Sequence, residues 1–220
     1  APVSRLVTVT VTPVNDPPLP QPDAGATNED TAKTFTAVQL LANDAKGPTA
    51  PAGTGDNETT QVLTLSSVNP LSAAGGTVTL SSGVVTYSPP ANFNGQDTFT
   101  YRVTDDGLTN GQIDRRDATG TVTVTVAAVN DGPQVAAPAN VQVNEDQAGP
   151  IAGISVSDLD VGNNHLAVTL SVSHGTLTVN VDPAAGGLTD ANVAGNGTSL
   201  VTISGTLQQI NTTLASANGL

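Results

Sequence analysis

The amino-acid sequence predicts an all-β fold made of β-sandwich modules in tandem, and three observations lead to this prediction. Thr, Val, Gly, Asn, Asp and Pro are abundant, whereas aromatic residues make up 2% and Cys, Met and Trp are absent. Such a composition favours short strands and tight turns over helices. Apolar residues alternate with Thr at Leu6–Thr12 and Thr121–Val126, as in half-buried strands. The stretch VTVTVTPVNDPP at 7–18 returns as VTVTVAAVNDGP at 122–133.

The internal repeat sets the expected domain boundaries. Four further blocks recur in the same order: Asn28–Asp30 with Asn144–Asp146, Asn43–Asp44 with Ser157–Asp158, Leu63–Ser66 with Val168–Ser171, and Gly76–Leu80 with Gly175–Val179. We therefore expect residues 1–13 to be the last strand of a preceding module, residues 14–130 to form one module and residues 131–220 a second. A module of roughly 100–120 residues suits an immunoglobulin-like sandwich.

Local patterns predict further elements within the modules. Val85 and Tyr87 lie on one face of a predicted strand, Thr98–Val103 forms the next strand, and Ser88–Gly95 forms a turn between them. The apolar spacing in Leu207–Leu214 predicts a short helix. All five aromatic residues belong to the first module. Because the second module has no counterpart of the aromatic block at 87–101, we expect it to be incomplete and to lack its C-terminal strands.

Charge and composition disfavour several classes of function. The net charge is −13 with only six Lys and Arg, so nucleic acid and anionic membrane surfaces are not expected partners. No apolar run is long enough to span a bilayer, and the absence of Cys excludes disulfides and thiol chemistry. The two histidines, His165 and His174, lie in no recognisable catalytic motif, and there is no phosphate-binding loop. We therefore do not expect an enzyme.

Acidic residues cluster where the repeat places module junctions, which suggests Ca²⁺ binding. Calcium takes six to eight oxygen ligands, and loops rich in Asp, Asn and Gly supply them, although the same residues also form ordinary turns. The better candidate set contains Asn130, Asp131, Glu145, Asp158 and Asp160. The weaker set contains Asn15, Asp16, Glu29, Asp30 and Asp44. Asp158 and Asp160 form a D-x-D pair, but in the weaker set this pattern is broken, because Lys46 stands two residues after Asp44.

The order of these motifs identifies a family resemblance. VTVTVTPVNDPP, NEDT, LLANDA, LTLSSV and GTVTLSSGVVTYSPPANFNGQDTFTYRVTDDG closely resemble the bacterial cadherin-like tandem repeats of large secreted surface adhesins, often of the RTX type. The second module resembles a sister type from the same arrays. The resemblance implies cadherin-like β-sandwich modules in an extended array, calcium near the linkers and export to the bacterial cell surface. It also implies that Asp105 or Asp106 contributes to the junction that contains Asn130.

The expected function is therefore a structural spacer in a cell-surface adhesin, stiffened by calcium and supporting cell adhesion or biofilm formation. Its expected partners are neighbouring modules of the same array. Two alternative functions stay open. The first is a subunit of an extracellular fibre in which identical chains assemble head to tail by strand exchange. The second is a module that binds glycan or protein through the long loop Asp44–Gln61.

Overall fold

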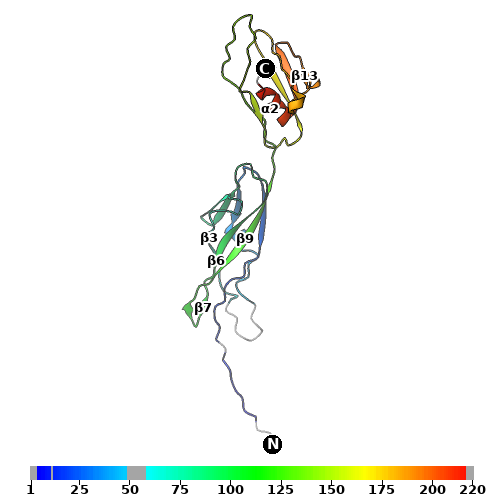
Figure 1. Cartoon of the computed structure of the whole chain (residues 1–220). Helices are drawn as coiled ribbons and strands as arrows, with labels where there is room; N and C mark the ends of the chain where they lie inside the picture. Colours follow the sequence, from blue (N-terminus) through cyan, green and yellow to red (C-terminus); the bar gives the residue numbers. More distant parts are fainter. Residues whose placement is uncertain (1–3, 11, 49–57, 217–220) are drawn as a thin grey trace. The chain divides into compact units, whose positions relative to one another are not determined.

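The computed structural model describes residues 4–10, 12–48 and 58–216. The chain divides into unit 1, Ala1–Val129, and unit 2, Asn130–Leu220, one residue from the predicted boundary. Most elements are strands, which confirms the all-β fold class (Figure 1). No helix in the described residues is long and apolar enough to cross a membrane. Residues 4–10 and 12 form no strand.

Unit 1 contains two sheets that pack face to face. The larger sheet has the order β1-β9-β6-β3 and the smaller has the order β2-β5-β4. The strands of the two sheets are β1 Asp23–Asn28, β2 Lys33–Thr36, β3 Thr64–Val68, β4 Thr77–Ser81, β5 Val84–Ser88, β6 Gly95–Thr104 and β9 Asp117–Ala127. Helix α1, Ala37–Leu40, follows β2, and the hairpin β7 Leu108–Thr109 with β8 Gln112–Ile113 precedes β9. Strand β1 pairs in parallel with β9, whereas the other pairs of unit 1 are antiparallel.

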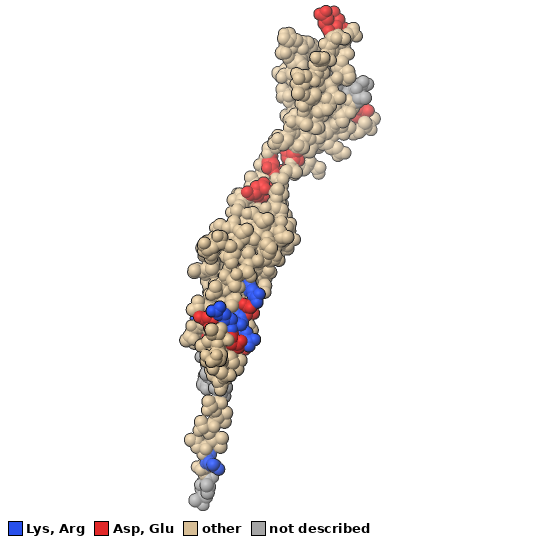
Figure 2. Space-filling model, turned by 90° about the vertical axis from the view of Figure 1, so that its left-hand side faces the viewer, with Lys and Arg blue, Asp and Glu red and all other residues tan. Residues whose placement is uncertain are grey.

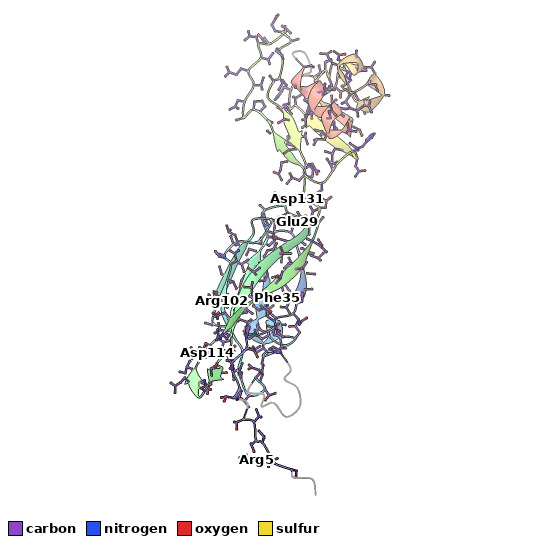
Figure 3. The ribbon with its side chains drawn as sticks, turned by 60° about the horizontal axis from the view of Figure 1, so that its bottom comes forward. Arg5, Glu29, Phe35, Arg102, Asp114 and Asp131 are labelled. Carbon is purple, nitrogen blue, oxygen red and sulfur yellow. The ribbon has the colours of Figure 1, made fainter. Side chains whose placement is uncertain are left out.

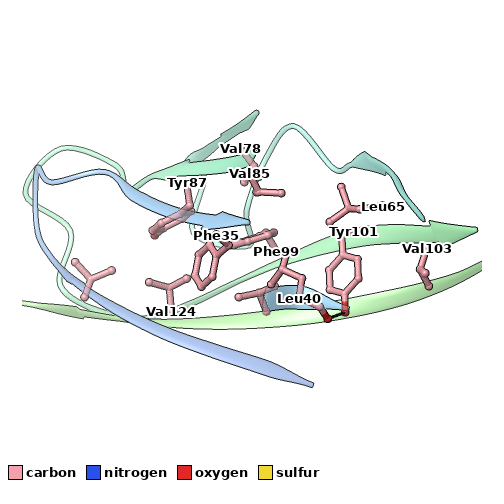
Figure 4. Packing of buried hydrophobic residues seen from close by; sticks show 12 residues of the cluster. Phe35, Leu40, Leu65, Val78, Val85, Tyr87, Phe99, Tyr101, Val103 and Val124 are labelled. Atoms are coloured by element: carbon pink, nitrogen blue, oxygen red, sulfur yellow. Dashed lines mark hydrogen bonds between the residues drawn. The ribbon is translucent and has the colours of Figure 1, made fainter. Parts of the chain in front are cut away.

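The core of unit 1 lies between these sheets, and its side chains alternate along the strands as the sequence predicts (Figure 4). Phe99 contacts Phe35 edge to face and stacks on Tyr87, with ring centroids 5.9 Å apart in both pairs. Tyr101 lies across Gly120, its partner in the β6–β9 register. A Cβ atom at Gly120 would lie 2.2 Å from the Tyr101 ring, so this position requires glycine.

Unit 2 packs a helix against a small antiparallel sheet. Its strands are β10 Gln134–Ala136 paired with β11 Ser155–Ser157, and β12 His165–Ser171, β14 Leu200–Thr206 and β13 Val193–Ala194 in the order β12-β14-β13. Two short 3₁₀ helices, η1 Pro183–Ala185 and η2 Asp190–Asn192, lie between β12 and β13. Helix α2, Leu207–Ala215, forms where the apolar spacing predicts it. Thr206 and Gln209 cap it reciprocally, and Ile210 and Leu214 are buried against the sheet. That unit 2 is an incomplete module stays a prediction.

Candidate metal centre

Four polar side chains are buried together at the end of unit 1 where the chain enters. Asn15 comes from the VND motif, Glu58 and Gln61 precede β3, and Asp105 follows β6. Their exposed fractions are only 3–6%. Asp114, which also bonds to Asn15, is labelled at this end of unit 1 in Figure 3. Burial of so many polar groups requires partners for each of them.

The loop after β6 is shaped to hold this cluster. The Asp105 carboxylate accepts hydrogen bonds at Oδ1 from the backbone N–H groups of Gly107, at 3.0 Å, and Arg116, at 2.9 Å. A Cβ atom at Gly107 would lie 2.0 Å from Asn15 Oδ1, so only glycine leaves room for the asparagine. The Asp105-Asp106-Gly107 turn and Asn15 therefore form one local structure.

Two acceptor oxygens of the cluster receive no hydrogen bond. Asn15 Nδ2 donates to Asp105 Oδ1, at 3.0 Å, and to the Asp114 carbonyl. Gln61 Nε2 donates to Asn15 Oδ1, at 2.6 Å, and to Glu58 Oε2. Each amide nitrogen has thus used both of its protons. Asp105 Oδ2 and Gln61 Oε1 are buried without any hydrogen-bond partner. The cluster therefore has more oxygen acceptors than protons, which is the condition a bound cation relieves.

The electrostatics of the cluster agree with this count. Burial raises the pKa of the Glu58 carboxyl, and the nearby charges of Asp16 and Asp105 raise it further against opposing hydrogen bonds. Basic and acidic side chains also lie next to one another on unit 1 (Figure 2), and Lys46 Nζ donates to the carbonyl of Thr59, the neighbour of Glu58, at 2.9 Å. Arg102 pairs with Asp117, and Arg116 pairs with Asp114 at 2.9 Å. The Thr109 hydroxyl, followed by Arg116, lowers the pKa of Asp114.

The donor set fits a hard cation such as Ca²⁺ and not one that prefers nitrogen or sulfur, because it consists of carboxylate and amide oxygens. Among the residues that the structure describes, no three Asp, Glu or His side chains come together as a metal-holding group. A cation held here would rely on amide oxygens as well as carboxylates, with backbone carbonyls or water completing the coordination. A surface cavity of about 500 Å³ lies beside the cluster, and its lining includes Gln61, Asp106 and Gly107.

The weaker predicted set does not come together at one site. Asn15 and Asp16 lie near the start of β9, and the Asp16 N–H donates to Glu58 at 3.3 Å. Glu29 and Asp30 follow the opposite end of the β1–β9 pair. Strand β9 has 11 residues, so about 30 Å separates its two ends.

Glu29 and Asp30 bind backbone groups at their own end of unit 1. Glu29 accepts a hydrogen bond from the Val129 N–H, and Asp30 accepts one from Asn92 at 3.0 Å. The Asp44 carboxylate lies elsewhere and accepts hydrogen bonds from the Gln21 N–H and the Tyr101 hydroxyl. Among the described residues, the side-chain hydrogen bonds of Asn15 go to Asp105, Asp114 and Gln61 and to neither of these regions.

Asp105 and Asp106 also lie at a place that the resemblance did not imply. Asp105 bonds to Asn15, and Asp106 accepts the Val62 N–H at 2.7 Å, so both belong to the entry end of unit 1 and not with Asn130. The reason is the pairing of β6 with β9, which brings the end of β6 beside the start of β9. Metal binding by these residues stays a prediction.

The second predicted set is partly assembled within unit 2. Asp158 Oδ1 accepts the N–H groups of Asp160, at 3.0 Å, and Val161, at 2.9 Å. Asp160 Oδ2 accepts the Asp131 N–H at 2.5 Å, and Asn130 Nδ2 donates to the Asp131 carbonyl. The D-x-D turn therefore meets the Asn-Asp pair.

Glu145 is not part of that arrangement. It lies in an exposed turn closed by the bond from the Gln147 N–H to the Asn144 carbonyl, and its carboxylate makes no hydrogen bond or ion pair with the described residues.

Glu58 and Gln61 are the site residues that sequence reasoning missed. They follow the part of the long loop at 49–57 that lies outside the described residues, and the repeat offers no counterpart for them. The one available signal is their position just before the strand that contains Leu63–Ser66, where a loop returns to the sheet.

Comparison with known proteins agrees with this fold. A family model described as a bacterial cadherin-like domain matches residues 15–128, from the asparagine of the first VND motif to the end of β9. No curated protein matches the chain. The matched region covers more than half of the 220 residues and includes Asn15, Gln61 and Asp105. The chain belongs to the bacterial cadherin-like domain family.

Proposed function

We propose that this chain is a spacer segment of an extracellular bacterial adhesin, of the RTX type, that calcium stiffens so that the adhesin can support cell adhesion or biofilm formation. The observation that carries the proposal is the pair of buried acceptor oxygens, Asp105 Oδ2 and Gln61 Oε1, for which the described residues supply no proton. Membership of the cadherin-like family supports a surface repeat module in general.

The stiffening acts through the segment that enters unit 1. Without a cation, Asp105 Oδ2 is buried with no hydrogen-bond partner, which costs stability. A bound Ca²⁺ would be contacted by Asp105 Oδ2 and Gln61 Oε1, and it would fix Asn15, which is hydrogen-bonded to Asp105 and Gln61. Binding to the folded state alone raises stability by RT ln(1 + [Ca²⁺]/Kd), and extracellular modules operate at dissociation constants of about 10⁻⁴–10⁻³ M.

Neither catalysis nor sugar binding finds support at this end of unit 1. The cavity beside the cluster is lined by polar residues, glycines, Pro13 and Leu108, with no aromatic side chain among the described residues, so these residues offer no stacking surface for a sugar ring. Both histidines belong to unit 2 and are exposed. We accordingly propose a non-catalytic role, with neighbouring modules as the partners and neither nucleic acid nor a membrane among them.

Thermal melting with calcium and with chelator tests the proposal. Both tyrosines are in unit 1 and the chain has no Trp, so tyrosine fluorescence reports on unit 1 alone. Calcium is expected to raise the melting temperature of this signal. Asp105→Asn keeps Oδ1 as the acceptor and replaces the unpartnered oxygen by an amide nitrogen. This variant should melt higher than wild type in chelator and should lose the calcium response.

Asp190→Asn is the matched control, since it removes one carboxylate from the exposed η2 turn of unit 2 and should leave the calcium shift unchanged. An identical melting temperature of the wild-type chain in calcium and chelator would refute the proposed site. A full calcium shift in Asp105→Asn would show that calcium binds elsewhere.

A further inference from the structure

The first and last long strands of unit 1 lie side by side and run in the same direction (Figure 1). The register runs from Asp23 opposite Val122 to Asn28 opposite Ala127 without a bulge. The chain enters unit 1 ahead of β1 and leaves it after β9. Tension on the chain therefore pulls the start of β1 and the end of β9 in opposite directions along the strand axes.

This direction of pull decides how the pairing fails. When two parallel strands are drawn apart lengthwise, every hydrogen bond of their ladder bears force at the same time, and all must break together. When a hairpin is pulled at its open end, the bonds break one after another and each break needs little force. The β1–β9 pair is of the first kind, because parallel strands present their entry and exit at opposite ends.

Glu29 fastens the exit end of this ladder. Its N–H donates to the Ala127 carbonyl at 2.9 Å, and its carboxylate accepts the Val129 N–H. The residue is 4% exposed, so water has little access to compete for these bonds. The outgoing chain is thereby tied to the end of β1 beyond the last ladder pair.

Tyr101 fastens the entry end. Its hydroxyl shares its one proton between Asp23, the first residue of β1, at 3.0 Å, the Leu40 carbonyl at 3.1 Å and Asp44 at 3.2 Å, and the side chain is 1% exposed. Strand β9 is held independently, since its other edge pairs with β6 over ten residue pairs and Val122 and Val124 are fully buried. The β1–β9 ladder is therefore the contact that must yield before unit 1 can open.

We propose that the parallel β1–β9 ladder, fastened by Glu29 and by the Asp23–Tyr101 bond, is a mechanical clamp that keeps unit 1 folded under tension along the chain. The inference deepens the spacer role proposed above, yet the clamp contains no residue of the Asn15–Asp105 cluster. It predicts resistance to force in the absence of calcium.

Unit 2 provides an internal comparison. Its strand pairs are all antiparallel in the described residues, and its last described element is α2, which is held by packing and by hydrogen bonds between Asn211 and Val156. Helix α2 can peel from the sheet piecewise. Unit 2 should therefore open at a lower force than unit 1.

Single-molecule stretching of the whole chain in chelator tests the clamp. The chain has no cysteine, so cysteines added at its two ends give unique handles. We expect two rupture events, the weaker from unit 2 and the stronger from unit 1. The stronger event should release the stretch from Asp23 to Ala127, about 105 residues or roughly 350–380 Å of extended chain.

Two Glu29 variants distinguish loss of the Glu29 hydrogen bond from a general loss of stability. Glu29→Ala should lower the unit 1 rupture force, whereas Glu29→Gln keeps an acceptor oxygen and should retain most of it. Glu145→Ala is the matched control, since this residue occupies the same repeat motif in unit 2 and its carboxylate has no partner among the described residues. It should change neither event.

Changing the direction of pulling tests the clamp without a substitution that destabilises the fold. Handles at Gln21→Cys and Thr121→Cys, beside the same end of both strands, would unzip the ladder, and the unit 1 force should fall below its end-to-end value. Equal forces in the two geometries, or a unit 1 event no stronger than that of unit 2, would overturn the clamp. A missing calcium shift in thermal melting would refute the metal site and leave the clamp untouched.

Discussion

Asp97 offers the sharpest test of how unit 1 is held together. Its carboxylate is 2% exposed and accepts four hydrogen bonds: from Ser72 Oγ at 2.5 Å, Thr98 N at 2.7 Å, Ala74 N at 2.8 Å and Tyr87 Oη at 2.8 Å. Burial alone would raise the pKa of Asp97, but these donors outweigh it, so the pKa lies below its usual value. The group is therefore ionised and fully partnered at neutral pH.

Asp97→Ala removes all four acceptor contacts and leaves the buried Tyr87 hydroxyl without a partner, whereas the Ser72 hydroxyl can still donate to the Gly76 carbonyl at 3.3 Å. A buried donor left unsatisfied costs about 1–3 kcal/mol, so the Tyr87 hydroxyl alone accounts for a loss of this size. The N–H groups of Ala74 and Thr98 are less buried and can turn to water. Against a domain stability of about 5–15 kcal/mol, the loss removes a large share of the folding free energy of unit 1.

Urea unfolding followed by tyrosine fluorescence measures this loss in unit 1 alone, because unit 2 contains no aromatic residue. Asp97→Asn should cost less than Asp97→Ala, since Oδ1 can still accept the two N–H groups. Tyr87→Phe should cost about 1–2 kcal/mol, as it removes one donor and leaves Asp97 three others. Asp117→Ala removes an exposed ion pair and should change little. A loss below about 1 kcal/mol in Asp97→Ala would refute the reasoning.

Three further predictions follow from the same structure. Gly107→Ala would place a Cβ atom 2.0 Å from Asn15 Oδ1, so it should displace that side chain and abolish the calcium shift seen by tyrosine fluorescence; an unchanged shift would contradict the assigned site. Ile210→Ala should destabilise unit 2 by about 2–5 kcal/mol in far-UV circular dichroism, while the tyrosine transition of unit 1 stays in place. Burial raises the pKa of Asp44, despite hydrogen bonds from Gln21 and Tyr101, so its ionised form costs stability. The contribution is favourable at low pH and is lost as pH rises through the folded pKa. Asp44→Asn should therefore make the urea midpoint depend less on pH above the usual carboxyl pKa of 3.8, and parallel profiles of variant and wild type would contradict this.

Local structure follows closely from the sequence. The alternation of apolar residues and Thr predicts the strands at Thr98–Val103 and Thr121–Val126, and both form within β6 and β9. The helical spacing at Leu207–Leu214 gives α2. These patterns are readable because each depends on neighbours within a few residues, where side-chain periodicity and capping decide the backbone conformation.

The candidate metal site was less accessible to sequence reasoning. Spacing along the chain grouped Asn15 with Glu29, but the length of β9 keeps them at opposite ends of unit 1. Asp105 joins Asn15 because β6 and β9 run antiparallel, which is a property of the sheet and not of any short motif. Glu58 and Gln61 carry no motif at all and become site residues only when the loop before β3 closes over Asn15.

The two Asn-Glu-Asp motifs separate what the sequence determines from what the tertiary structure decides. By itself the sequence determines the turn, since Asp30 and Asp146 adopt the same left-handed backbone conformation, with φ of 55° and 60°, and each motif closes on its own Asn carbonyl. Only the tertiary structure decides what the glutamate does. Glu29 is buried against the end of β9 and binds the outgoing chain, whereas Glu145 meets no such strand in the described residues and stays exposed. A turn is encoded by adjacent residues, but burial of its side chain depends on a strand that pairs from a hundred positions away.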